Sequence, residues 1–470
     1  MKNTFVLLCA LLCSFSVYAT TYQVGATRTY VSPYALYQAN VVVNGDIIEI
    51  DAETYSGNAC LAVWQASDLL IRGVGGRPHL EAAGQYIWGK GIWVLAGDHI
   101  TVENIEFSGA TVPDKNGAGI RLDGSGLTVR HCFFHDNENG ILTNNTYSGD
   151  ILIEYSEFAN NGFGAGYSHN LYIGHVNKLT FQFNYTHHAF IGHCLKSRAN
   201  ENYIYYNRIA DEETGASSRL IDLPNGGFSI IMGNLLMQGE DAPNNNMVGY
   251  GREGLSNTDS QVFIINNTFV NKRIGSCIFV DIEPGTVVAN VSNNIFAGGG
   301  TLINGTTTTM DHNLEESSIA DLFFTDEMNY NYHLTEASPA INYGVAINAV
   351  NGYSLTPDFV YEHPLASAER ITVGDTIDVG AYEYINPLET SLVLLESIQV
   401  FPNPTTGMLT IYSPEYPVQH TTVLDVLGRI LWEAKDVQTI DLSRLHEGVY
   451  YLKIETRGGF SAVRRIVKGI

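Results

Sequence analysis

Short segments in which apolar and polar residues alternate recur along the middle of the chain. Each has the length of a brief strand, is rich in β-formers and shows no helical periodicity. Anchored at the residues below, successive copies are 27, 24, 28, 23, 27, 33 and 27 residues apart. A repeat of about 25 residues predicts one coil of a parallel β-solenoid. The anchors are Ile105, Cys132, Ser156, Asn184, Asn207, Asn234, Asn267 and Asn294.

Asparagine occupies the anchor position in the last five copies. Identical amides stacked at one register can hydrogen-bond from coil to coil, as they do in cross-β ladders. We therefore expect these asparagines to lie in turns and to stack, and we assign them no catalytic role. They are Asn184, Asn207, Asn234, Asn267 and Asn294.

The first residues have the character of an export signal. Lys2 supplies a positive start, residues 5–17 are nearly all apolar, and Val17-Tyr18-Ala19 ends the run with small residues around a cleavage position. We expect residues 1–19 to be a signal peptide.

No later stretch is apolar over the roughly 18 residues that a membrane helix needs, which predicts an exported protein without a membrane span. The cysteines that remain are expected to be buried free thiols: Cys60, Cys132, Cys194 and Cys277.

The pattern changes twice towards the C-terminus. Residues 316–388 are less regular, and we expect them to cap the open end of a solenoid spanning residues 20–315. After a linker at 389–395, residues 396–470 contain eight acidic and eight basic residues, so the whole formal charge of −24 belongs to residues 1–395. This asymmetry supports a separate domain. Its alternating strands between Gly and Pro turns predict a small antiparallel β-sandwich.

Two resemblances to known families rest on these residues. Gly45 to Ile50, Leu70 to Gly73 and the Asn-bearing copies resemble right-handed parallel β-helix proteins of the pectate-lyase-like class. The fold class implied is all-β, a right-handed parallel β-helix followed by a small C-terminal β-sandwich. That fold is shared by lyases, hydrolases, epimerases and non-catalytic surface proteins, so it does not settle the function.

The C-terminal motifs resemble the type A sorting domain of the type IX secretion system. They are Val400 to Gly407, Leu424 to Arg429, Gly448 to Ile454 and Arg464 to Lys468. The resemblance implies a Bacteroidetes-type host, export by the type IX machinery and a secreted or cell-surface location. A carbohydrate-binding sandwich is the alternative interpretation of this domain.

Composition limits the partners. Only 16% of the residues are charged, and Lys plus Arg number 25 against 49 Asp plus Glu. A chain this acidic repels nucleic acid and anionic membranes, which argues against binding to either. An anionic polysaccharide would bind only at a local basic patch. We expect a monomer.

Such a patch is indicated between residues 131 and 219. Seven of the 14 histidines lie between 131 and 193, and four cations follow. Lys196 lies 12 residues after Asn184 and Arg219 lies 12 after Asn207, so we expect the two cations to stack on one outward face. An alignment on Leu171, Leu195 and Leu220 keeps them on the same face. Neighbours expected to point outward there are Asn170, Tyr172 and Cys194, and Asp222 or Glu201 would bridge the like charges.

This patch favours β-elimination from a uronate-containing polysaccharide. The reaction needs a cation for the carboxylate, a base for the adjacent carbon and an acid for the leaving oxygen. Arg219 and Arg198 suit the first role, Lys196 the second, and His193 or Tyr172 the third. We expect His169, Asn170 and Asp222 to help bind or orient the substrate.

The pairing of a Lys base with an Arg one coil later resembles chondroitinase B and alginate lyases on a β-helix, which use calcium. No acidic ladder here maps onto that calcium site, so Ca²⁺ stays open and no metal ligand is assigned. Two other functions also stay open, a uronate epimerase and a non-catalytic glycan-binding or adhesin-like surface protein. A plain solvated face, with salt bridges to Glu201, Asp211, Glu212 or Glu213, is the structural alternative for the patch.

Overall fold

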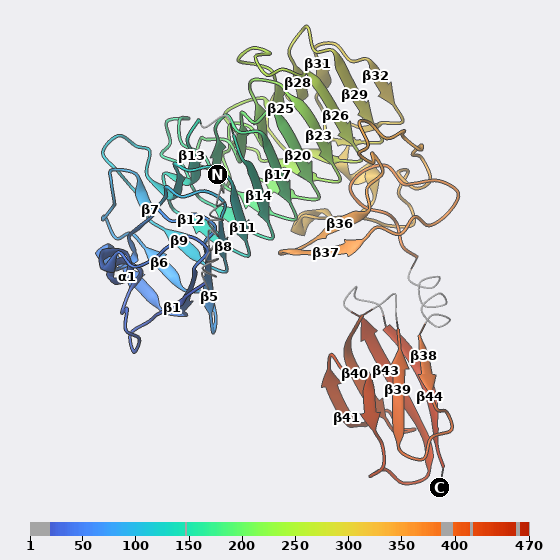
Figure 1. Ribbon diagram of the computed structural model, residues 1–470. Coiled ribbons are helices and arrows are strands. Elements are labelled where there is room, and N and C mark those ends of the chain that lie inside the picture. Colours follow the sequence, from blue (N-terminus) through green and yellow to red (C-terminus); the bar gives the residue numbers. More distant parts are fainter. Residues whose placement is uncertain (1–18, 146–147, 387–397, 414–416, 457–460, 470) are drawn as a thin grey trace, which may run out of the picture.

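A solenoid of parallel strands makes up most of the protein in this computed structural model (Figure 1). The structure describes residues 19–145, 148–386, 398–413, 417–456 and 461–469. Most of the expected signal peptide, residues 1–18, and the expected linker at 389–395 lie outside the described residues. Successive strands visit three sheets in turn, so each sheet contains every third strand along most of the chain.

All strand pairs within the three sheets are parallel, and we name the sheets A, B and C. Sheet A contains β1 (Thr21–Val24), β2 (Ile47–Asp51), β5 (Leu70–Val74), β8 (Ile100–Glu103), β11 (Leu127–Arg130), β14 (Asp150–Glu154), β17 (Lys178–Gln182), β20 (Glu201–Tyr205), β23 (Phe228–Met232), β26 (Gln261–Ile265), β29 (Val288–Ser292) and β32 (Thr309–Asp311). Sheet B contains β3 (Thr54–Ser56), β6 (His79–Glu81), β9 (Glu106–Ser108), β12 (Phe133–His135), β15 (Glu157–Ala159), β18 (Tyr185–His187), β21 (Arg208–Ala210), β24 (Leu235–Gln238), β27 (Thr268–Asn271), β30 (Ile295–Ala297) and β33 (Leu314–Glu316). Sheet C contains β4 (Ala62–Trp64), β7 (Gly91–Leu95), β10 (Ala118–Leu122), β13 (Asn139–Thr143), β16 (Leu171–Ile173), β19 (Leu195–Ser197), β22 (Ile221–Leu223), β25 (Asn246–Tyr250), β28 (Ile278–Ile282) and β31 (Thr301–Asn304).

The core lies inside the solenoid, where like residues stack on like. In β14, Ile151 and Ile153 are buried while Asp150 is exposed, as period-two alternation requires. On sheet B the rings of Phe107, Phe134 and Phe158 stack, with successive centroids 4.9 Å apart. Because each coil repeats the register of the one before, side chains of the same kind form continuous apolar columns.

The expected asparagine ladder is confirmed. It lies at the corner between sheets A and B, where the backbone N–H and Nδ2 of each Asn donate to Oδ1 of the next. The step from Asn207 to Asn234 has both bonds at 2.9 Å. Nδ2 of Asn234 also donates to the carbonyl of Ile204 at 2.8 Å. The ladder begins with Ser156 donating to Asn184 and continues through Asn294 to Asn313. Every ladder Asn from 184 to 294 is fully buried, so these amides replace water as the partners of buried backbone groups.

The first coil is covered by a short helix, and the thiols lie inside. Helix α1 (Pro33–Ala39) packs against β4 and η1 (Gly57–Cys60), burying Leu36. The four cysteines from residue 60 onward are free and buried, as expected, and burial raises the pKa of the Cys60 thiol to about 12. No helix among the described residues is long and apolar enough to cross a membrane.

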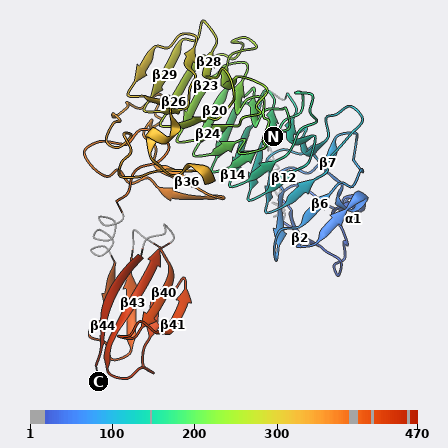
Figure 2. The same cartoon turned by 180° about the vertical axis from the view of Figure 1, so that it is seen from behind.

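The segment after the solenoid lies along its flank and not over the open end, where we expected a cap (Figures 1 and 2). It carries η2 (Ile319–Leu322), β34 (Phe324–Asp326), η3 (Glu327–Asn329), β35 (Asn331–Leu334), β36 (Phe359–Glu362) and β37 (Ala366–Glu369). The later coils explain this course, because their outward faces are apolar. Leu322, Tyr332 and Val379 pack on the outer side of sheet B, against Leu235 and Met237 among others. Met310, in the last strand of sheet A, stays 48% exposed.

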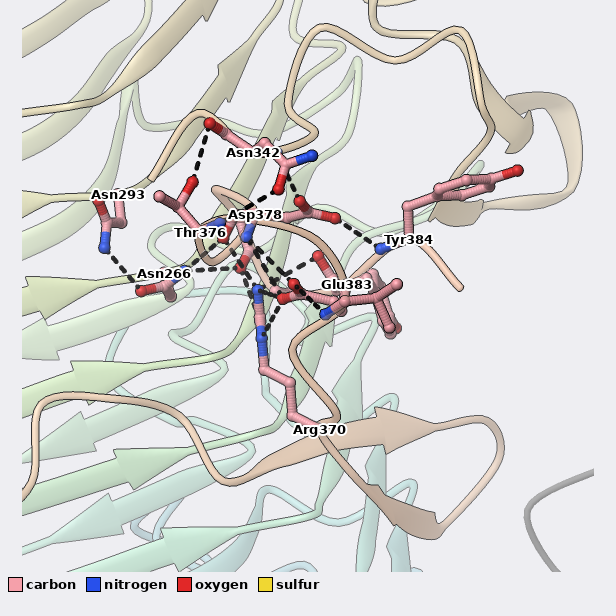
Figure 3. Close-up of polar contacts among 12 residues, drawn as sticks. Asn266, Asn293, Asn342, Arg370, Thr376, Asp378, Glu383 and Tyr384 are labelled. Carbon is pink, nitrogen blue, oxygen red and sulfur yellow. Dashed lines mark hydrogen bonds and ion pairs between the residues drawn. The ribbon is translucent and has the colours of Figure 1, made fainter. Parts of the chain in front are cut away.

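A buried polar cluster fastens this segment to the corner of the solenoid (Figure 3). Asn266 donates to the carbonyl of Asp378 at 2.9 Å, and Asn293 donates to that of Val345 at 2.8 Å. Behind them Arg370 Nε donates to Glu383 Oε2 at 3.0 Å, and both side chains are almost fully buried. Burial lowers the pKa of Arg370 and raises that of Glu383.

Two small antiparallel sheets form the C-terminal region, around an apolar core of their own. One contains β38 (Gln399–Phe401), β39 (Met408–Tyr412) and β42 (Thr439–Asp441). The other contains β41 (Ile430–Lys435), β40 (Val418–Leu424), β43 (Gly448–Thr456) and β44 (Ser461–Lys468). This is the antiparallel architecture expected for the region.

Candidate functional site

Neighbouring strands of sheet C bring the candidate residues together. The register places Tyr172 of β16 beside Lys196 of β19, and Lys196 beside Asp222 of β22. The expected stacking of Lys196 on Arg219 is therefore wrong, since Arg219 precedes β22 and stands three residues from the aligned position. The cause is loop length: ten residues connect β21 to β22, but only seven connect β18 to β19.

The carboxylate of Asp222 is the centre of the cluster, and its side chain is fully buried. Arg219 Nη1 lies 2.8 Å from Oδ1, and Lys196 Nζ lies 3.3 Å from Oδ2. His193 Nε2 approaches Oδ2 at 3.5 Å. Asp222 thus bridges the positive charges of Lys196 and Arg219, a role that the sequence analysis considered for it. On the next coil Gly249 leaves room for this arrangement, because a Cβ there would lie 3.1 Å from Asp222 Oδ1.

A second carboxylate reaches the cluster from the loop after β25. Glu253 Oε1 lies 2.8 Å from Lys196 Nζ, and its Oε2 lies 2.6 Å from Arg198 Nη2. Its side chain is 47% exposed, far more than the 11% of Lys196 or the 15% of Arg198. Burial acts to raise its pKa, but hydrogen bonds from Lys196 and Arg198 outweigh burial and lower the pKa of Glu253 to about 2. A carboxylate is therefore bound between these two cations at any ordinary pH.

Arg198 is held by polar groups on both sides. Its Nε donates to the hydroxyl oxygen of Tyr172 at 2.8 Å, and its Nη1 donates to Asn225 Oδ1 at 2.5 Å. The guanidinium lies 5.7 Å from the centroid of the Tyr172 ring. These contacts fix the plane of the guanidinium, so that Nη2 faces the Glu253 carboxylate.

Two stacked histidines form the inner wall of the cluster. The rings of His169 and His193 are 4.8 Å apart and nearly parallel. The His193 N–H donates to His169 Nδ1, and the Arg219 N–H donates to His193 Nδ1, so both Nδ1 atoms are acceptors. Burial, followed by the charges of Lys196 and Arg219, lowers the pKa of His193 to about 3. His193 is therefore neutral near pH 7, with its proton on Nε2 towards Asp222.

The family comparisons agree with this architecture. Residues 399–469 match the model described as the secretion system C-terminal sorting domain, and residues 83–171 match that of the right handed beta helix region. The chain is a right-handed β-helix protein with a secretion-system sorting domain. It is thus a secreted or surface protein, as the type IX resemblance implied.

Solved structures show only distant likeness to the β-helix protein. Pectate lyase Pel9A shares 14% identity at a TM-score of 0.45, covering 78% of this chain and 97% of its own. A pectin methylesterase in complex with a hexasaccharide shares 8% at a TM-score of 0.28, covering 68% and 99%. None of the curated proteins matches the sequence.

Two residues expected on the outward face of the β-helix protein are inside it. Asn170 is fully buried, and its Oδ1 accepts from Asn161 while its Nδ2 donates to Thr186 at 2.9 Å. It belongs to a second amide ladder with Asn137 and Asn161, at the corner between sheets B and C. Cys194 is also fully buried. Asn170 precedes β16 and Cys194 precedes β19, at points where the chain turns inward. The alternation of outward and inward side chains along a strand therefore does not apply to them.

Sequence reasoning missed Glu253 and Asn225. Glu253 is 57 residues from Lys196 along the chain and reaches it only because its loop folds back over two coils. Asn225 lies in the segment Asp222 to Gly227, whose Pro, Asn and Gly residues are typical of a turn and not of a binding site. The only signal in the sequence that pointed to an acidic residue such as Glu253 was charge. Neighbouring cations such as Lys196 and Arg198 need acidic partners close by.

The donors at this site do not fit calcium. Ca²⁺ prefers six to eight oxygen ligands, whereas the oxygens of Asp222 and Glu253 face Lys and Arg side chains. In the described part of the chain, no group of three or more His, Cys, Asp or Glu side chains able to share an ion includes either carboxylate. We therefore derive no step through calcium.

Proposed function

We propose that this secreted β-helix protein is a polysaccharide lyase that cleaves a uronate-containing chain by β-elimination. The observation that supports it is the Glu253 carboxylate held between Lys196 Nζ and Arg198 Nη2. A uronate carboxylate has the same chemistry and can take the same place. The side chain of Glu253, half exposed on its loop, is the member of the cluster most easily displaced.

The reaction follows from those positions. The uronate carboxylate replaces Glu253 and binds Arg198, whose charge stabilises the negative charge that builds up on the carboxylate. With Glu253 displaced, the unprotonated amine form of Lys196 takes the proton from the adjacent carbon, C5, and becomes an ammonium group. The C5–H electron pair forms the C4–C5 double bond, the C4–O bond breaks, and the leaving oxygen takes the Tyr172 hydroxyl proton. Tyr172 suits this role better than His193, because its oxygen already accepts from Arg198 and its proton is free to point outward.

The other residues predicted for the site act through Arg198, Lys196 and Tyr172. Arg219 pairs with Asp222, and Asp222 contacts Lys196, so both are positioning residues for the base. His193 and His169 form the wall behind Asp222. In this scheme Arg198 holds the carboxylate alone, without the help of Arg219 that the sequence suggested. An epimerase would share the first proton transfer and return the proton to the opposite face.

Glycan binding without chemistry is the second candidate, and a separate cavity favours it. A space of about 400 Å³ lies between sheet B and the flank segment, beside Arg208. Arg208 Nε is buried there without a hydrogen-bond partner. The ring of Tyr330, which is partly exposed there, could stack on a sugar face. Among its lining residues are Tyr185, Tyr330, Tyr332 and Tyr382.

A panel of alginate, pectate, glycosaminoglycan and glucuronan tests the reaction. We expect one member to yield unsaturated uronate, read by its ultraviolet absorbance, because elimination leaves a C4–C5 double bond. An uncleaved product with inverted configuration at C5 would indicate the epimerase. If a panel member binds and none changes chemically, the binding protein replaces the lyase.

Glu253→Ala is expected to tighten the binding of the polyuronate by a few-fold, up to about tenfold, because the internal competitor for Arg198 is lost. Calorimetric titration measures this. Glu283→Ala is the matched control, since it removes the same charge from a neighbouring loop, where Glu283 pairs with Arg252 at 2.7 Å. Weaker or unchanged binding by Glu253→Ala would count against a carboxylate site between Lys196 and Arg198.

A further inference from the structure

Three side chains on the outer face of sheet B converge away from the Lys196 cluster. His79 of β6 and Glu106 of β9 are aligned on successive coils, and His135 of β12 lies one coil further, two positions along. One ligand atom from each lies within 4.8 Å of the others. His79 Nε2 is 3.6 Å and His135 Nε2 is 3.1 Å from the same oxygen, Glu106 Oε1.

These distances suit a shared ion. Ligands about 2.0–2.1 Å from a tetrahedral zinc ion lie roughly 3.3–3.4 Å from one another. The two observed distances from Glu106 Oε1 fall on either side of that range. The three side chains are 19–27% exposed, so an ion there would keep contact with solvent.

Hydrogen bonding orients His135 towards the same point. Its Nδ1 lies 2.7 Å from Asp136 Oδ2, the carboxylate–histidine arrangement that fixes the tautomer of metal-binding imidazoles. With the proton on Nδ1, the lone pair of Nε2 faces Glu106 Oε1 at 3.1 Å. Two electron-rich atoms so placed repel each other unless a proton or a metal cation lies between them. His79 Nε2, 2.7 Å from Ser108 Oγ, faces the same space.

We propose that His79, Glu106 and His135 form a binding site for a divalent transition metal, Zn²⁺ above all. Two imidazoles and one carboxylate are a donor set typical of zinc, with a fourth position left for water. The ion would join three successive coils of sheet B, and the site is independent of the elimination chemistry at sheet C.

Titration of the full, tag-free chain with ZnCl₂ and with CoCl₂ tests the site. We expect one ion per chain, visible absorption bands of four-coordinate Co²⁺, and a thermal midpoint that rises with added Zn²⁺. His79→Gln combined with His135→Gln should abolish all three. Asp136→Asn, at an exposed position that threatens folding little, should weaken Zn²⁺ binding about 10- to 100-fold.

His187→Gln is the matched control. His187 Nε2 lies 3.2 Å from Glu157 on the same sheet, but the pair belongs to no group of three donors found among the described residues. Zn²⁺ affinity and the Co²⁺ spectrum should stay those of the wild type. A wild-type chain that binds no Zn²⁺, or a double variant that binds it as well as the wild type, would overturn the proposal and leave a protonated His135 between two carboxylates as the explanation.

Discussion

Lys196→Arg is expected to lower kcat on a cleaved polyuronate by about 10²- to 10⁴-fold, the usual contribution of a positioned general base. The guanidinium keeps the positive charge beside Asp222 and Glu253. It stays protonated at every accessible pH, so it cannot take the C5 proton. The rate of unsaturated product at saturating substrate measures the effect, and the thermal midpoint should stay close to that of the wild type.

Arginine is a sharper replacement than alanine here. Although we expected Lys196 on an outward face, it is only 9% exposed and contacts a fully buried carboxylate. Alanine would remove one of the two cations beside Asp222, so lost turnover and lost folding could not be told apart. Lys178→Arg is the control, at a lysine of sheet A paired with Asp150 at 2.8 Å. Wild-type turnover by Lys196→Arg would exclude Lys196 as the base.

Arg370→Met is expected to destabilise the protein by about 3–5 kcal/mol, because it leaves the Glu383 carboxylate buried without its counter-charge. The guanidinium also donates to the carbonyls of Gly380 and Asp378 at 3.0 Å each, and these would lose a partner (Figure 3). Urea denaturation measures the free energy of unfolding. Hydrogen exchange in β36 and β37 tells whether the flank segment detaches first.

Two further variants test whether the loss of stability comes from the buried charge pair. Arg72→Met makes the same chemical change at a pair with Glu49 whose arginine side chain is 42% exposed, and should cost less than about 1 kcal/mol. Arg370→Met combined with Glu383→Leu removes both charges and should recover much of the loss. A single variant as stable as the wild type would mean that the cluster does not hold the segment in place.

The coil and its asparagine corner could be predicted because they depend on local, repeated chemistry. Each buried Asn satisfies the same backbone groups in its coil, so Asn184 and Asn294 carry the same signal in the sequence. The flank segment could not be placed in the same way. Its position depends on outward apolar residues such as Leu235 and Met237, which the repeat pattern assigns to the coil without saying what covers them.

The candidate site was only partly predictable, for a related reason. Counting from the asparagine anchors aligned Lys196 with Arg219, because the count crossed a loop whose length differs between coils. His79 and Glu106 are 27 residues apart, the most frequent coil spacing, yet no motif marks them. Their proximity becomes evident only when sheet B is assembled.

The corner between sheets A and B has a consequence for how this protein can vary. From β8 to β33, two residues always connect the two sheets there, whereas the loops from sheet B to sheet C contain 3 to 11 residues. An insertion at the first corner would break the amide ladder, whereas the loops between sheets B and C already differ in length from coil to coil while the strands around them stay in register. Arg219 lies in one of these loops and Glu253 lies in the loop from sheet C to sheet A after β25, whereas Tyr172 and Lys196 lie on strands β16 and β19. Exchanging these loops would therefore move Arg219 and Glu253 while the register of Tyr172 and Lys196 on their strands stays as it is.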